Sequence, residues 1–159
     1  EAPNFVLADT TLVKLTRGSN STPALTDVDG DGDLDLFIGE SSGELNFYRN
    51  VGSRFAPSFE LVSDRFSEID AGRRSFPAFA DIDGDGDEDL ILGREEGGVL
   101  LYRREGSVAD VDPLFVVDST FTLPLPNYST PSLVDIDGDG DLDVFSGGRG
   151  GGLILLEGR

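Results

Sequence analysis

PALTDVDGDGDLDLFIG, residues Pro23–Gly39, returns with few changes at Pro77–Gly93 (PAFADIDGDGDEDLILG) and at Pro131–Gly147 (PSLVDIDGDGDLDVFSG). The first aspartates of successive copies lie 54 residues apart. A solvated polar turn could produce one such stretch, but not three copies in register at a constant period. The spacing therefore indicates a repeat protein in which each copy builds one structural unit.

Each copy contains the pattern DxDGDGDxD, with aspartates at loop positions 1, 3, 5, 7 and 9 and a glycine at position 6. This is the pattern by which a tight loop wraps oxygen ligands around a Ca²⁺ ion. We expect the side chains at positions 1, 3, 5 and 9 and the backbone carbonyl at position 7 to bind the metal. The predicted metal ligands are Asp27, Asp29, Asp31, Asp33, Asp35, Asp81, Asp83, Asp85, Asp87, Asp89, Asp135, Asp137, Asp139, Asp141 and Asp143.

Calcium is the ion that this set of donors favours. The five carboxylates of each loop repel one another, so the loop needs a cation to hold them together. Mg²⁺ demands near-octahedral geometry and keeps its waters, whereas Ca²⁺ accepts a flexible loop of carboxylates and carbonyls. Zn²⁺ is disfavoured because the chain has no Cys and no His. We therefore predict three Ca²⁺ ions per chain, one in each loop.

The residues after each loop exclude the helical calcium motifs. An EF-hand or dockerin loop leads into a helix, and an EF-hand supplies a bidentate Glu at position 12. Here position 12 is Ile38, Leu92 or Ser146, and each loop runs into a short apolar segment that ends at Gly. Such segments are too short for helices and are typical of buried strands, so each loop should join strand to strand.

Each repeat contains four segments with the character of strands, and no segment shows a convincing helical period. Val99–Tyr102 is apolar on both faces, as expected of a strand between two sheets. Repeats of about fifty residues with four strands each are typical of β-propeller blades. The expected strands are Phe5–Ala8, Thr22–Thr26, Asp35–Gly39, Leu45–Arg49, Phe59–Ser63, Phe76–Ala80, Asp89–Gly93, Gly98–Arg103, Phe115–Asp118, Thr130–Val134, Asp143–Gly147 and Leu153–Glu157.

The loop with its Pro and Gly flanks resembles the FG-GAP (VCBS-type) calcium-binding repeats, the blades of integrin alpha-subunit propellers and of many bacterial surface and secreted proteins. The resemblance covers essentially the whole chain, although the opening Phe-Gly signature is only partly kept. It implies an all-β propeller in which the calcium loop links the first two strands of each blade and the ion is chiefly structural. It also implies that ligands contact the face opposite the calcium loops.

The order of the strands predicts how the ring closes. We expect a single repeat domain, residues 1–159, with three four-stranded blades centred on 23–57, 77–112 and 131–159 and with outer strands near 5–8, 59–63 and 115–118. Propellers carry about four to eight blades. Three blades therefore predict a head-to-tail homodimer with six blades, in which Phe5–Ala8 completes the partner's third blade. The alternative is a fragment or engineered piece of a longer propeller.

Composition narrows the functions that fit. The net charge of −19 disfavours nucleic acid and anionic membranes, and no apolar run is long enough to insert into a membrane. The absence of His and Cys excludes histidine triads and thiol nucleophiles, so we do not expect an enzyme. Without a bidentate ligand at position 12, the loops should bind Ca²⁺ in the weak range of extracellular modules. This predicts a secreted or cell-surface protein.

A binding role follows as the favoured function: an extracellular adhesion module, or a scaffold for a protein or carbohydrate ligand. Alternation of strand direction places the connections between blades on the face opposite the calcium loops, together with turns that carry Glu40, Arg94, Glu95 and Arg149. Two alternatives remain, a calcium-dependent hydrolase of phytase or glycosidase type and a purely structural or assembly propeller. The candidate ligand-binding residues are Arg17, Asn20, Arg73, Arg74, Asn127 and Tyr128.

Overall fold

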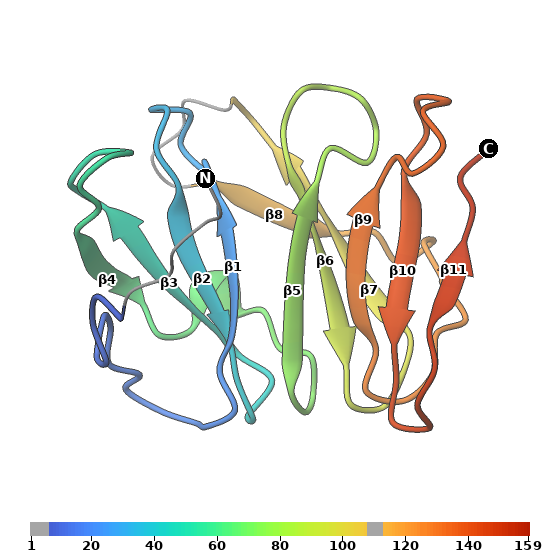
Figure 1. Cartoon of the computed structure of the whole chain (residues 1–159), viewed down its shortest axis with the longest axis horizontal. Coiled ribbons are helices and arrows are strands. Elements are labelled where there is room, and N and C mark those ends of the chain that lie inside the picture. The colour runs from blue at the N-terminus through green and yellow to red at the C-terminus, as the bar shows by residue number, and fades with distance from the viewer. Residues whose placement is uncertain (1–6, 108–112) are drawn as a thin grey trace.

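The computed structural model describes residues 7–107 and 113–159, and these residues form an all-β molecule of three antiparallel sheets (Figure 1). The first and second sheets have four strands each, in the orders β1-β2-β3-β4 and β5-β6-β7-β8, and the third has the order β11-β10-β9. The strands are β1 (Thr22–Thr26), β2 (Asp35–Gly39), β3 (Leu45–Asn50), β4 (Phe59–Ser63), β5 (Ser75–Ala80), β6 (Asp89–Arg94), β7 (Val99–Glu105), β8 (Leu114–Val117), β9 (Thr130–Val134), β10 (Asp143–Gly147) and β11 (Ile154–Leu156).

The acidic loop occupies the same place in every sheet. The first two strands of each sheet pair in register up to the residues that flank the loop, which are Thr26 and Asp35 in the first sheet. The last residue of each loop pattern is therefore also the first residue of the second strand. This arrangement confirms the expectation that each loop joins strand to strand.

Apart from Phe5–Ala8, the expected strands agree with the observed ones to within two residues at each end. Of the expected outer strand Phe5–Ala8, Phe5 and Val6 lie outside the described residues, while Leu7 and Ala8 are exposed and belong to no strand. In the part of the chain that the structure describes, the third sheet has three strands rather than the four expected of each blade.

A short 3-10 turn, η1 (Phe66–Glu68), lies between β4 and β5 and was not predicted. Ser67 in its middle has a φ of 52°, so the turn carries no helical period that a sequence pattern could reveal. Its Phe66 is buried among the side chains of the first two sheets. In residues 7–107 and 113–159, no helix is long and apolar enough to cross a membrane.

Two cores hold the three sheets together face to face. Between the first and second sheets, Phe37 stacks on Phe47 at a centroid distance of 4.5 Å, and Phe66 meets both rings edge on. Between the second and third sheets, Ile91 and Leu101 are the fully buried centre. Because alternate residues of the central sheet point to opposite faces, both of its faces are apolar, as predicted for Val99–Tyr102.

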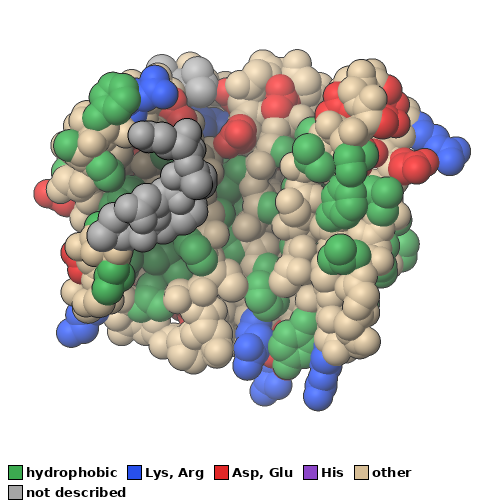
Figure 2. Space-filling view, in the orientation of Figure 1, with side chains coloured by type: hydrophobic (Ala, Val, Ile, Leu, Met, Phe, Trp, Pro, Cys, Tyr) green, Lys and Arg blue, Asp and Glu red, His purple; other side chains and the backbone are tan. Residues whose placement is uncertain are grey.

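The two ends of the molecule differ in charge. All three acidic loops lie at the upper end in Figure 1, and the turns between the second and third strands of each sheet lie at the lower end. Figure 2 shows acidic side chains concentrated at the upper end and a group of Lys and Arg side chains at the lower end below β5 and β9. The strand alternation predicted from the sequence therefore separates the acidic loops from the candidate ligand-binding face.

Candidate metal centres

The first aspartate of each loop fixes the loop's shape. In the first loop the two carboxylate oxygens of Asp27 accept the N–H groups of Asp31, at 3.1 Å, and of Gly32, at 3.0 Å. Asp81 accepts the corresponding two N–H groups in the second loop, and Asp135 accepts that of Gly140 in the third. The chain thus curls around the carboxylate at position 1, which places the later odd-numbered positions around the same centre.

Three carboxylates converge in each loop, with one oxygen from each residue within 4.8 Å of the others. The first two loops bring together positions 1, 3 and 5, and the third brings together positions 1, 3 and 9. Of the fifteen predicted ligands, these nine meet in common centres. The groups are Asp27, Asp29 and Asp31; Asp81, Asp83 and Asp85; and Asp135, Asp137 and Asp143.

The aspartate at position 9 also anchors the neighbouring strand. One oxygen of Asp35 accepts the N–H of Asn50 at the end of β3, at 2.7 Å. Asp89 accepts the N–H of Arg104 at 2.8 Å, and Asp143 accepts that of Gly158 at 2.9 Å. All three aspartates are buried. Burial raises the pKa of Asp35 to about 6, and burial likewise raises the pKa of Asp89.

The aspartates at position 7 were predicted to bind the metal through their backbone carbonyls, and their side chains belong to none of the three converging groups. The pKa of Asp33 is raised by the removal of its carboxyl from water and by the nearby charges of Asp31, Asp29 and Asp27. Asp87 instead lies 3.7 Å from the buried guanidinium of Arg104. The side chain of Asp87 therefore pairs with Arg104 and is not part of the group formed by Asp81, Asp83 and Asp85.

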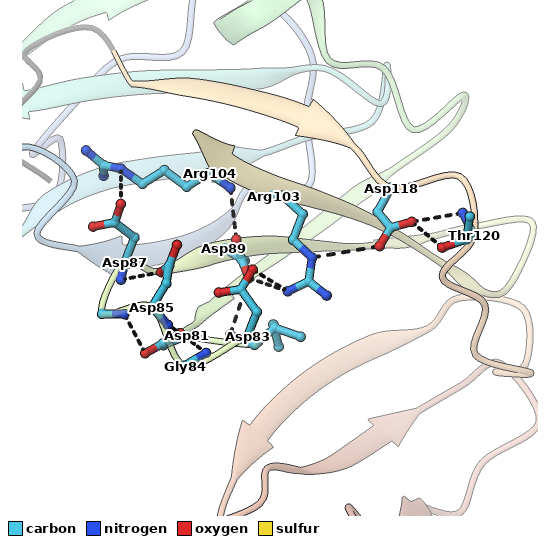
Figure 3. A network of polar contacts seen from close by, with 12 residues as sticks. Asp81, Asp83, Gly84, Asp85, Asp87, Asp89, Arg103, Arg104, Asp118 and Thr120 are labelled. Atoms are coloured by element: carbon cyan, nitrogen blue, oxygen red, sulfur yellow. Dashed lines mark hydrogen bonds and ion pairs between the residues drawn. The ribbon is translucent and has the colours of Figure 1, made fainter. Parts of the chain in front are cut away.

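Arginines that the sequence reasoning missed lie against two of the loops, and Figure 3 shows the second of these loops. Arg103 of β7 pairs with Asp89 at 2.8 Å, with Asp83 at 3.3 Å and with Asp118 at 3.8 Å. Its counterpart Arg49 of β3 lies 3.2 Å from Asp29. The available signal was the spacing, because the two arginines are 54 residues apart and thus share the period of the loops.

The donors present fit a hard divalent cation. Every converging group in the described residues consists of carboxylate oxygens. Ca²⁺ takes six to eight oxygen ligands in roughly this kind of flexible loop. The absence of nitrogen and sulfur donors argues against zinc, since the chain contains no His and no Cys.

Some of the predicted ligand-binding residues meet at the opposite end. The ring of Tyr128 lies between two guanidinium groups, with Arg74 at 5.4 Å and Arg149 at 5.6 Å from the ring centroid. Glu95 pairs with Arg74 at 3.1 Å and with Arg73 at 3.9 Å. Asn127 lies next to this group, and its carbonyl accepts the N–H of Arg149 at 2.9 Å.

Other residues expected on this face have different roles. The carboxylate of Glu40 is buried and accepts the N–H of Ser42 at 2.7 Å, so it is not available to a ligand. Arg17 pairs weakly with Asp64 at 3.7 Å. Asn20 donates to the hydroxyl of Ser19 at 3.1 Å. Sequence alone could not separate these residues from the Tyr128 group, because the group joins side chains from two different repeats.

Comparison with known proteins agrees with the repeat architecture. The model of the FG-GAP-like repeat matches the chain twice, over residues 27–92 and over residues 81–146. No curated protein and no solved structure gives a significant match. The two family matches span the three acidic loops and strands β2 to β9, and together they cover most of the chain. The chain therefore belongs to the FG-GAP-like repeat family.

Proposed function

We propose that the protein is a calcium-stabilised β-propeller module that acts outside the cell as a binding or adhesion scaffold, without catalytic activity. The observation that carries the proposal is the convergence of three aspartates in each of three loops at one end of the molecule. Carboxylates this close repel one another and gain most from a hard divalent cation. The role of the ion is structural, because each loop also fixes the register of its sheet.

When bound, Ca²⁺ would neutralise the carboxylates that each loop gathers. Asp27, Asp29 and Asp31 would hold it in the first loop, and the equivalent groups would hold it in the other two. The aspartate at position 9 links each loop to the third strand of its sheet, as Asp35 does with Asn50. A loop fixed by calcium therefore keeps three strands in register.

Ligand binding is assigned to the Tyr128 face, opposite the calcium loops. Arg73 has a well-exposed side chain, and the arginines around Tyr128 give this end a positive surface on an otherwise acidic protein. Arginine and tyrosine are enriched at recognition hot spots. The proposed ligand is an acidic segment of a protein or an acidic carbohydrate.

An extracellular location fits this proposal. FG-GAP repeats are typical of extracellular proteins, and calcium is abundant there. The loops lack the bidentate ligand that tightens intracellular calcium sites, so they would stay filled only where calcium is plentiful.

The three sheets are also proposed to be half of a six-bladed ring that two copies of the chain close head to tail. The first and third sheets each pack on the central sheet with one face only. Propellers contain about four to eight blades, and six is the multiple of three in that range. The proposed binding partner that closes the ring is therefore a second copy of the chain.

The calcium role is tested by thermal unfolding in Ca²⁺ and in EDTA. We expect EDTA to lower the melting temperature by many degrees, because it removes a ligand that binds only the folded loops. Asp29→Ala, Asp83→Ala and Asp137→Ala should each remove part of that difference. Glu60→Ala, on an exposed edge strand, serves as the control. A melting temperature that is the same in Ca²⁺ and EDTA would contradict the proposal.

The ligand face is tested with glycan arrays and with acidic peptide libraries. Arg74→Ala and Tyr128→Ala should abolish any binding that the unaltered protein shows. Arg54→Ala removes an arginine that stacks on Phe55 in the β3–β4 connection and should leave binding intact. Equal loss of binding in all three variants would exclude this face as the site.

A further inference from the structure

A serine latch joins the first sheet to the second. Ser75, at the start of β5, donates its N–H to the carbonyl of Glu40 at 3.1 Å, and its hydroxyl accepts the N–H of Glu40 at 2.9 Å. The same hydroxyl donates to the carbonyl of Glu44 at 2.8 Å. The turn between β2 and β3 is thus held by one serine of the next sheet, and that serine is fully buried.

The same latch joins the second sheet to the third, with every participant 54 residues further along the chain. Ser129 donates its N–H to the carbonyl of Arg94 at 3.2 Å, and its hydroxyl accepts the N–H of Arg94 at 3.1 Å. The hydroxyl also donates to the carbonyl of Gly98. Two independent occurrences show that the latch is a property of the repeat.

A glycine makes room for each latch. A Cβ atom on Gly39 would lie 2.2 Å from the carbonyl oxygen of Ser75, and one on Gly93 would lie 2.1 Å from that of Ser129. Both values are far below contact distance, so no side chain fits at either position while the next sheet is in place. The glycine is required by the neighbouring sheet rather than by its own strand.

The serine and the glycine of the third copy of the latch are separated by the central sheet: the serine precedes the first sheet, and the glycine belongs to the third. Gly147 is the third glycine, yet among residues 7–107 and 113–159 the only atom within 4 Å of a Cβ there is the hydroxyl oxygen of Thr130, a side-chain atom of its own sheet, at 2.9 Å. Ser21 is the third serine and is exposed, although Ser75 and Ser129 are 1 % and 0 % exposed. The turn that would receive Ser21 is Gly148–Gly152, after β10.

We propose that Ser21 of one copy closes this latch on Gly148 and Gly152 of a second copy, with its carbonyl oxygen seated against Gly147. The inference rests on the ring proposed above and names the contact that forms it. Ser21 bears the same relation to Gly148 and Gly152 as Ser75 bears to Glu40 and Glu44. The partner therefore supplies the residue that completes the turn.

Apolar side chains on the two end faces support the same pairing. Val28 in the first acidic loop is 1 % exposed and packs in the core shared with the second sheet, whereas its counterpart Ile136 in the third loop is 58 % exposed. Leu45 and Val99 are buried, whereas their counterpart Leu153 is 78 % exposed. The third sheet thus presents outward the residues that the other two sheets bury against a neighbour, and Figure 2 shows hydrophobic side chains exposed over this sheet.

The first sheet offers the matching surface. Leu25 and Leu34 are about half exposed, and they line a groove of about 430 Å³ with Phe59. Inside the molecule Thr26 contacts Glu88, and the repeat places Leu34 of a second copy in the same relation to Val134. Both members of this last pair are apolar and exposed, so a second copy of this chain fits the face.

The test is light scattering on purified protein in calcium, combined with a single glycine substitution. The unaltered protein should have twice the chain mass. Gly147→Ala should weaken self-association at least tenfold and give the mass of one chain, because the added Cβ occupies the place of the Ser21 carbonyl. Gly150→Ala is the matched control: a Cβ there meets no atom within 4 Å, and the equivalent positions hold Ser42 and Glu96.

Cross-linking gives a second measurement, which does not depend on whether the protein folds with alanine at position 147. The chain has no cysteine, so Ser21→Cys with Thr130→Cys supplies the only thiols. Inside the molecule Thr22 donates to the carbonyl of Ser75 at 2.7 Å, and the repeat places Thr130 equally close to Ser21 of a second copy. A short bismaleimide should convert the double variant to covalent dimers and should leave each single variant uncross-linked.

The outcomes separate the latch from the ring. If Gly147→Ala still forms dimers as the unaltered protein does, and the double cysteine variant does not cross-link, the latch is overturned. Dimerisation itself would then still stand. A ladder of cross-linked masses above the dimer would support the latch and contradict a closed six-bladed ring. A monomeric unaltered protein would overturn both, and would leave the calcium proposal to its own test.

Discussion

Single arginine and aspartate side chains decide how stable each loop is without calcium. Arg103 contacts three carboxylates, those of Asp83, Asp89 and Asp118. In the third loop the equivalent residue is Glu157. The second loop therefore carries its own positive charge, whereas the third carries an additional negative charge and depends more on the metal.

Replacing Arg103 by Gln should destabilise the calcium-free protein more than the calcium-bound one. The variant loses a charged hydrogen bond to buried Asp89, a loss of about 1–2 kcal/mol when partial exposure is taken into account. Bound calcium would neutralise Asp83 and reduce the loss. Urea unfolding with and without Ca²⁺ measures both values, with Arg149→Gln as the control at the opposite end. An equal loss in the two conditions would contradict the role assigned to Arg103.

The calcium-free protein should lose stability as the pH rises from about 4 to about 7. The folded state raises the pKa of Asp35 from 3.8 to about 6, so between these values it holds a proton that the unfolded chain releases. The contribution of Asp35 to stability is fully present below pH 3.8, the pKa in the unfolded chain, and is lost as the pH rises through about 6, the pKa in the folded state. Denaturant unfolding of chelator-stripped protein tests this, and Asp35→Asn should flatten the dependence. A stability that increases over this range would contradict the assignment.

The sequence predicted the ligand residues better than it predicted their individual roles. All fifteen aspartates are identical in type, so nothing in the pattern separates Asp35, which anchors β3, from Asp31, which joins a converging group. That difference comes from burial, which depends on the fold. Arg103 was missed because its partners are distant in sequence and meet only across strands.

At the scale of the elements, the loops and the strands around them depend on one another. Each loop ends in an aspartate that is also the first residue of the next strand, and that aspartate binds the third strand. The strands that follow the loops, β2, β6 and β10, were predicted correctly from sequence because each is a short apolar segment that ends at or next to a Gly. The turn η1 escaped because one aromatic side chain, Phe66, holds it in place through contacts with Phe37 and Phe47.

Gly93→Ala should be strongly destabilising even though alanine suits a strand. Its Cβ would lie 2.1 Å from the carbonyl oxygen of Ser129, so the second and third sheets would have to separate. Overpacking of this kind costs about 1–3 kcal/mol. Thermal unfolding compares Gly93→Ala with Gly150→Ala, where the added Cβ has space. Equal melting temperatures would show that the latch between the sheets is not tight.

At the scale of the whole molecule, the repeat produces two ends of opposite character and two complementary side faces. The acidic loops lie at one end (Figure 1), and the Tyr128 group, which includes the residues just before β9, lies at the other. The order of strands in the sequence already implied both features. Which side chains meet across the sheets, such as Tyr128 with Arg74, could not be read from the sequence because it depends on the angle between neighbouring sheets.

Calorimetric titration of chelator-stripped protein with Ca²⁺ tests the central claim most directly. The account predicts uptake of three ions per chain, and Asp83→Ala should reduce the number to two. Unchanged uptake in Asp83→Ala would show that the ions bind elsewhere. The absence of any calcium uptake by the folded protein would contradict the claim that these acidic loops are metal centres.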